Sequence, residues 1–171
     1  MKIDNIRKKT QGITFVALSI VIILLLILVG ISFYVAKEEI EKERLEELKT
    51  DMLFIQAKAR EYVEEVNTKM GIGSEEEKIE RRDVARQEIY EEREKLEKAD
   101  TIPEQLQIVM EDGEICYYLT KETKEKWELE KIENEEEYLI KVDEKNAKVE
   151  VYYIEGYEGK YSLTEIGQIQ K

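Results

Sequence analysis

The side chains that most often do chemistry in enzymes are scarce in this chain of 171 residues. It contains no histidine, which removes the commonest general acid–base group and a frequent zinc ligand. Cys116 is the only cysteine, so no internal disulfide can form. No nucleophile–base pair stands out elsewhere. We therefore predict that the chain is not an enzyme and that it has no cofactor and no small-molecule substrate.

Carboxylates are the abundant reactive groups. The chain has 40 aspartates and glutamates against 27 lysines and arginines, a net charge of −13. Carboxylates can bind calcium, but no stretch has the ligand spacing of an EF-hand, so we predict a solvated acidic surface and no metal site. The acidic body repels phosphates, which argues against binding to DNA or RNA.

A long apolar stretch near the N-terminus is a candidate membrane anchor for the rest of the chain. Residues 13–36 are 24 residues without a charge, which as a helix span roughly 36 Å, against about 30 Å for the hydrocarbon core of a bilayer. A secretory signal would have an apolar region of only about 7–15 residues and a small-residue cleavage site, which the segment 34–38 does not supply. The stretch therefore predicts a transmembrane helix.

Charges differ on the two sides of this stretch. Residues 1–12 carry four basic side chains and one acidic side chain, a balance of +3, so the remainder must carry −16 to give −13. By the positive-inside rule the N-terminus lies in the cytoplasm and residues 37–171 lie outside. We predict a single-pass protein of the cell membrane with an extracytoplasmic body.

The junction between basic tip and apolar stretch has a specific pattern. It reads Lys8-Lys9-Thr10-Gln11-Gly12, followed by Ile13-Thr14-Phe15-Val16-Ala17-Leu18. This pattern resembles the prepilin processing site of type IV pilins and type II secretion pseudopilins. The resemblance implies that a prepilin peptidase cuts between Gly12 and Ile13 and methylates Ile13, and that the apolar helix remains as the assembly spine. Its implied partners are that peptidase, other pilin or pseudopilin subunits, and membrane lipid.

Ala17 departs from the family pattern. Most members have glutamate at this fifth mature position, where it is thought to pair with the terminal amine of a neighbouring subunit. An unpaired carboxylate is costly in lipid, so such pairing gives register. Family members without it include tip subunits and a Gly-Ile-Thr-Leu-Ile-Ala-Leu variant of low-GC Gram-positive bacteria, to which this chain is similar. The departure favours a minor subunit over a major one.

The helix is predicted to continue out of the membrane through residues 37–70, because no proline or capping signal interrupts it. Its apolar residues recur at alternating spacings of three and four, which defines a seam: Leu45, Leu48, Met52, Ile55, Ala59, Tyr62 and Val66. Such a seam packs either on the subunit's own sheet or on another chain in a coiled coil. The spacing is the same in both cases.

A glycine pair and a capping signal follow. Gly71 and Gly73 predict the end of the long helix, since glycine readily adopts the left-handed C′ conformation. Ser74 and Glu77 have the spacing of a capping box, which predicts a second, highly charged helix over 74–99. Its thin apolar side is predicted to be Ile79, Val84, Ile89 and Leu96.

Residues 100–171 form a strand-rich module in this interpretation. Pro103, the only proline, marks the joint before it. Short apolar pieces at 106–110 and 115–119 flank a turn, and 120–131 is expected to hold a short helix with Trp127. Alternation predicts two strands, with Tyr138, Ile140 and Val142 on one face of the first and Val149, Val151 and Tyr153 on one face of the second.

Two turns complete the module. Residues 143–147 form the expected hairpin loop, with Asn146 at a turn position. Tyr157 and Tyr161, around Gly156 and Gly159, are interpreted as packing and turn residues, with an aromatic ligand site as the alternative.

The fold class is therefore α+β. We expect a leader at 1–12, a transmembrane helix at 13–36, a spine helix at 37–70, a charged helix at 74–99 and an antiparallel sheet module at 100–171. This order matches the pilin layout and predicts a subunit that is cut after Gly12 and assembled into a type IV pilus or secretion pseudopilus. The alternative is an uncut single-pass scaffold with an external coiled coil, as at division sites.

Overall fold

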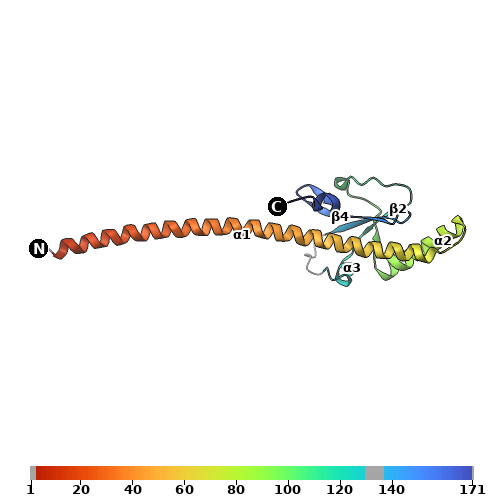
Figure 1. Ribbon diagram of the computed structural model, residues 1–171, viewed down its shortest axis with the longest axis horizontal. Helices are drawn as coiled ribbons and strands as arrows, with labels where there is room; N and C mark the ends of the chain where they lie inside the picture. The colour runs from red at the N-terminus through yellow and green to blue at the C-terminus, as the bar shows by residue number, and fades with distance from the viewer. Residues whose placement is uncertain (1–2, 130–136, 171) are drawn as a thin grey trace. The chain divides into compact units, whose positions relative to one another are not determined.

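The computed structural model describes residues 3–129 and 137–170, and the side chains of 18–34, 36–74, 76–129 and 137–170 (Figure 1). The chain divides into two compact units, Met1–Leu45 and Glu46–Lys171, and each is described by itself. Helix α1, Ile3–Met70, contributes residues to both units. The predicted α+β class is confirmed, with a long apolar N-terminal helix and a small antiparallel sheet.

The first unit is the N-terminal part of α1. Its large apolar side chains between Leu18 and Tyr34 are all exposed, by 49% to 74%. The helix is long and apolar enough to cross a membrane, since an 18-residue stretch of it has a mean hydropathy of 3.0. Past the apolar stretch, Lys37 and Glu41, and likewise Glu38 and Lys42, form ion pairs at helical i, i+4 spacing. The polar continuation of the helix is thus supported by local side-chain pairs.

The helix ends where the glycines predict. α1 stops at Met70, and Gly71 has a φ of +62°, the left-handed conformation that glycine adopts without a Cβ penalty. Helix α2, Glu75–Arg86, follows, with Ser74 as its N-cap. The Ser74 side chain accepts the Glu77 backbone N–H, and the Glu77 carboxylate accepts the Ser74 N–H. The predicted capping box is confirmed.

The second helix is shorter than the predicted span of 74–99. α2 passes into a π-helix, η1, at Gln87–Arg93, and Lys95 then adopts a left-handed φ of +59°. Strand β1, Glu97–Lys98, follows. Helix propensity is overridden here by tertiary packing, because the turn lets Leu96 be buried while Glu97–Lys98 pairs with the sheet.

The predicted apolar side of that helix is only half right. Ile89 and Leu96 are buried, but Ile79 and Val84 are 56% and 62% exposed. The buried side instead includes Ala85 and Tyr90. Both exposed residues lie in α2, before the π-helix begins, and there Ala85 is buried in place of Val84.

The sheet is a five-stranded antiparallel meander with strands in chain order β1-β2-β3-β4-β5. The strands after β1 are β2 at Glu114–Tyr118, β3 at Tyr138–Asp143, β4 at Lys148–Tyr157 and β5 at Lys160–Ser162. Three short helices lie between or after them: η2 at Glu104–Leu106, α3 at Lys121–Lys126 and α4 at Leu163–Gly167. The sheet therefore begins slightly before residue 100, the predicted start of the module.

One face of the sheet carries the predicted alternation. Ile140 lies opposite Val151, Val142 opposite Val149 and Tyr138 opposite Tyr153, and all six side chains are buried. The predicted hairpin loop is also present, since the Asn146 backbone N–H donates to the Asp143 carboxylate at 3.1 Å. The other face holds a smaller cluster of Leu106, Cys116 and Leu139.

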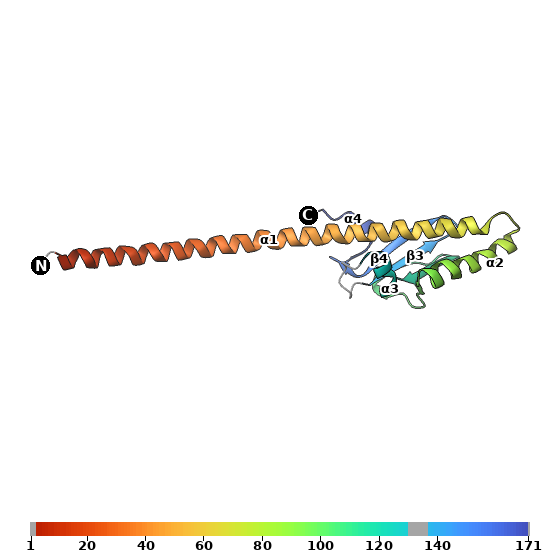
Figure 2. The same ribbon diagram turned by 90° about the horizontal axis from the view of Figure 1, so that it is seen from below.

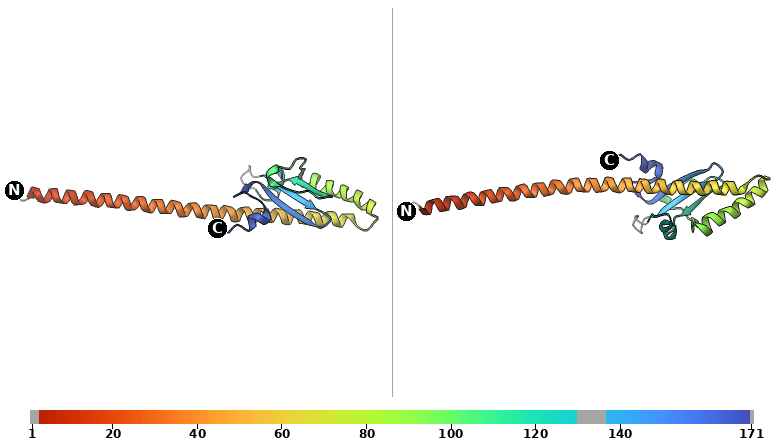
Figure 3. Two further views of the ribbon diagram at one scale, coloured as in Figure 1. Left: turned by 90° about the horizontal axis from the view of Figure 1, so that it is seen from above. Right: turned by 60° about the horizontal axis from the view of Figure 1, so that its bottom comes forward.

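Within the second unit, α1 runs along the sheet (Figures 2 and 3). The seam from Leu48 to Val66 is at most 8% exposed, and Val63, which the seam omitted, is fully buried. The side-chain amide of Gln56 on α1 donates to the carbonyl of Val149 on β4 at 3.0 Å. Of the two options left open by the spacing, the structure therefore has the seam packed within its own chain.

Candidate functional site

The predicted processing site lies at the start of the apolar part of α1. The backbone of Lys8, Lys9, Gly12 and Ile13 is helical. Their side chains, and those of Thr14, Phe15 and Ala17, lie outside the described ones. The site therefore stays a prediction from the residue pattern.

The described surface that follows is an apolar cylinder. Residues 18–33 have no acidic or basic side chain, and their large apolar groups point outward on every side. A shallow groove between successive helical turns is lined by Leu25, Leu28, Val29, Ser32, Phe33 and Ala36. Such a surface is stable only in lipid or against other apolar helices, since water contact with so much apolar area is unfavourable.

In the second unit, two helix amides bind the sheet backbone. Gln56 donates to the Val149 carbonyl, and Asn67, three turns further along, donates to the Glu144 carbonyl at 3.1 Å. Both carbonyls belong to the β3–β4 hairpin, so this hairpin is fixed to α1 at two points. The amides set the register of helix against sheet, which apolar contacts alone specify weakly.

A buried ion pair joins the hairpin to α2. Glu144 is 3% exposed, and its two carboxylate oxygens accept from Arg86 Nε at 2.8 Å and Arg86 Nη2 at 2.6 Å. Burial lowers the pKa of Arg86, but the hydrogen bonds and charge of Glu144 outweigh it and hold the pKa above its ordinary value. The pair is bidentate and desolvated, so it fixes the orientation of α2.

A second buried carboxylate, Glu94, joins η1 to α3. It accepts from Arg93 Nε at 2.9 Å, Trp127 Nε1 at 3.2 Å and Lys126 Nζ at 3.1 Å. Burial raises the pKa of this carboxyl, but these hydrogen bonds outweigh it and the pKa lies below its ordinary value. The tilted ring of Tyr62 on α1 lies 5.9 Å from that of Trp127, centroid to centroid. Glu94 is thus a structural anchor whose hydrogen-bonding capacity is satisfied.

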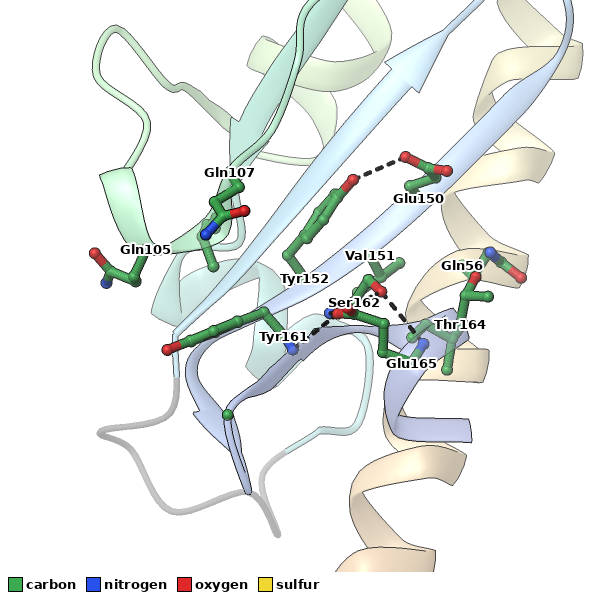
Figure 4. Close-up of a pocket in the computed structure, with 13 residues that line it drawn as sticks. Gln56, Gln105, Gln107, Glu150, Val151, Tyr152, Tyr161, Ser162, Thr164 and Glu165 are labelled. Carbon is green, nitrogen blue, oxygen red and sulfur yellow. Dashed lines mark hydrogen bonds between the residues drawn. The ribbon is translucent and has the colours of Figure 1, made fainter. Parts of the chain in front are cut away.

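A polar groove opens between the sheet and the segments at its β5 edge (Figure 4). Its volume is about 470 Å³. Gln105 and Gln107 line one side, Tyr152 and Tyr161 contribute rings, and Ser162, Thr164 and Gln56 line the other side. The Tyr152 hydroxyl donates to Glu150 at 2.8 Å.

Reactive groups are few in the part of the chain that the structure describes. No group of three or more acidic, histidine or cysteine side chains there is arranged to hold a metal ion. Burial raises the pKa of the Cys116 thiol to about 11, so the thiolate is scarce at neutral pH.

Comparison with protein-family models finds no match, and neither a curated protein nor a solved structure is significantly similar to this chain.

Several structural anchors were not identified from the sequence. Arg86, Glu94 and Glu144 lie in segments so rich in charge that nothing marks the two glutamates as buried or Arg86 as the partner of one of them. Gln105 and Gln107 lie in a segment without regular periodicity. The sequence predicts a packing or turn role for Tyr161. In the structure Tyr161 packs against the Leu106 cluster and also lines the groove.

Proposed function

We propose that this chain is a prepilin-like membrane subunit that is cut between Gly12 and Ile13 and assembled into a type IV pilus or secretion pseudopilus. The observation that carries the proposal is the pattern Lys-Lys-Thr-Gln-Gly-Ile-Thr-Phe at the start of a long apolar helix. Its chemistry is that of a substrate, because the catalytic groups belong to the peptidase. The absence of glutamate at Ala17 favours a minor subunit.

The exposed apolar helix supports an assembly role. Between Leu18 and Tyr34 its apolar side chains have no partner within the described chain. In a bilayer they contact lipid, and in a fibre they contact the helices of other subunits. Lipid tails and leucine side chains are similarly apolar, so this exchange costs little and helix packing can decide it.

The second unit supports the same proposal in another way. Its part of α1 is covered by an antiparallel sheet of its own chain, with the seam buried and two amides bound to the β3–β4 hairpin. A long helix that is apolar at one end and carries a small sheet at the other is the layout expected of a pilin subunit.

The scaffold alternative draws less support from these contacts. An external coiled coil would need the seam residues from Leu48 to Val66 to face another chain, but their side chains are at most 8% exposed. Forming it would require the sheet to leave the helix. That would expose the buried apolar face of the sheet and break the amide bonds of Gln56 and Asn67.

Substitution of Gly12 tests the proposal. In cells with a working prepilin peptidase, Gly12→Ala should leave membrane insertion intact and leave the precursor uncut or poorly cut. Gly30→Ala is the matched control, because a Cβ at Gly30 meets no atom within 4 Å. Precursor and product are separated by mass after membrane isolation. Normal processing of Gly12→Ala would show that the resemblance is accidental.

A further inference from the structure

The groove beside β5 has a lining unlike the rest of the second unit. Its polar groups are mainly uncharged: Gln56 from α1, Gln105 and Gln107 from η2 and its C-cap, together with Ser162 and Thr164. No lysine or arginine lines it within the described chain, although basic residues are frequent elsewhere in the sequence. An anionic ligand would find no positive partner here.

The two carboxylates of the groove are already engaged. Glu150 accepts the Tyr152 hydroxyl at 2.8 Å. Glu165 accepts the backbone N–H and the hydroxyl of Ser162, at 3.2 Å and 3.0 Å. These bonds occupy Oε2 of each carboxylate and orient it. Among the described residues no third acidic side chain joins them to hold a metal ion, so the groups left to recognise a ligand are mainly uncharged and suit a neutral one.

Gln105 and Gln107 offer the free hydrogen-bonding groups. Both side chains are exposed, and neither amide has a hydrogen-bond partner among the residues that the structure describes. Gln107 adopts a left-handed φ of +48°, an uncommon conformation for a residue with a Cβ. Side-chain amides both donate and accept, so they pair well with hydroxyl groups, which do the same.

The tyrosine rings are fixed before any ligand arrives. Gly156 has a φ of +75°, and a Cβ there would lie 2.6 Å from Tyr161 Cε1, so the ring packs directly on the glycine backbone. Tyr152 and Tyr161 also pack against the Leu106 cluster. Rings held in this way present an apolar face beside polar groups without losing side-chain entropy on binding.

An extended peptide is a poorer fit than a sugar. It would bind by adding a strand to a free stretch of sheet edge. β4 has β3 on one side and β5 on the other from Tyr152 to Tyr157. Before that stretch the Val149 carbonyl already accepts the Gln56 amide at 3.0 Å. Strand addition would have to displace this helix–sheet contact.

We propose that this groove binds a neutral oligosaccharide, with its hydroxyl groups on Gln105 and Gln107 and an apolar sugar face against Tyr161. The inference concerns a ligand that is bound and not converted. It goes beyond the proposed function and stands or falls independently of processing at Gly12.

The test is binding of defined sugars to the full chain in lipid nanodiscs. The probes are three neutral tetrasaccharides: chitotetraose, cellotetraose and maltotetraose. Saturation-transfer NMR detects contact, and titration gives the affinity. We expect at least one probe to bind with a Kd of about 1 mM or tighter.

A double variant, Gln105→Ala with Gln107→Gly, removes both amides. Glycine suits the left-handed backbone at 107, so the loop should not be strained. We expect at least about tenfold weaker binding, since two hydrogen bonds are lost. Gln168→Ala is the matched control, because Gln168 is exposed and lies outside the groove. The affinity of this variant for the sugar should stay within about twofold of wild type.

Three results would overturn the proposal: no probe binds, the double variant binds as tightly as wild type, or the control loses as much affinity as the double variant. Unchanged near-ultraviolet circular dichroism in the variants shows that the fold is retained. Because the uncut precursor also carries the groove, failure here leaves the processing proposal untouched.

Discussion

The apolar side chains of helix α1 differ in exposure between its two segments. Between Leu18 and Tyr34 they are 49% to 74% exposed and point in all directions. Between Leu48 and Val66 most of them occupy one seam that is at most 8% exposed, whereas Leu53 and Phe54 lie outside the seam and are 55% and 39% exposed. The first segment is built for an apolar surrounding that the chain does not supply, and the second carries its own partner in the sheet.

This contrast explains why one helix can serve two purposes. A segment that is apolar on all sides has no preferred face, so it can exchange lipid for other helices. A segment with one apolar seam and two amide anchors has a fixed register against one sheet. The helix combines a replaceable contact surface with a specific one.

The largest effect is expected when a buried side chain of the seam is shortened. Ile55 is fully buried, so Ile55→Ala should lower the free energy of unfolding by about 2–5 kcal/mol through lost burial and a cavity. Leu53 is the control, because it lies on the exposed side of the same helix and is 55% exposed. Leu53→Ala should change the free energy of unfolding by less than about 0.5 kcal/mol. Urea unfolding in mild detergent can be followed by the fluorescence of Trp127, the only tryptophan. Equal losses in both variants would contradict the assignment of the seam.

A smaller effect is expected at the buried carboxylate. Glu94→Gln should cost about 1–3 kcal/mol at pH 7, because the charge that Arg93 and Lys126 face is removed. The pKa of Glu94 is depressed in the folded protein, so its contribution is fully present above the ordinary carboxyl pKa of 4.5 and is lost as the pH falls through the depressed value.

The difference in unfolding free energy between wild type and Glu94→Gln should therefore shrink as the pH falls below 4.5. Carboxyls with lowered pKa values that do not interact with Glu94, such as Asp143 and Glu165, are common to both proteins and cancel in this difference. Helix content between residues 18 and 33 should not respond, since that segment has no acidic or basic side chain. A pH-independent difference would show that the Glu94 contacts do not form in solution.

Much of the fold could be predicted because local signals agree with it. The glycine at 71, the Ser74 capping box and the period-two alternation at 138–142 and 149–153 each specify local structure directly. The seam could be identified from its spacing, although its partner could not, because a stripe of apolar residues has the same period against a sheet or another helix.

The remainder depends on contacts between distant segments. The π-helix at Gln87–Arg93 and the turn to β1 arise where Tyr90 and Leu96 become buried, and no local signal competes with the helix propensity there. The groove brings together Gln56, Gln107 and Ser162, which are far apart in the sequence. Local patterns carry no information on such proximity.

The most direct test of the central claim is the N-terminus of the protein in native membranes. Intact-mass and N-terminal peptide analysis should find a chain that begins at methylated Ile13 in cells that express a working prepilin peptidase. Recovery only of chains that begin at Met1 would contradict the account.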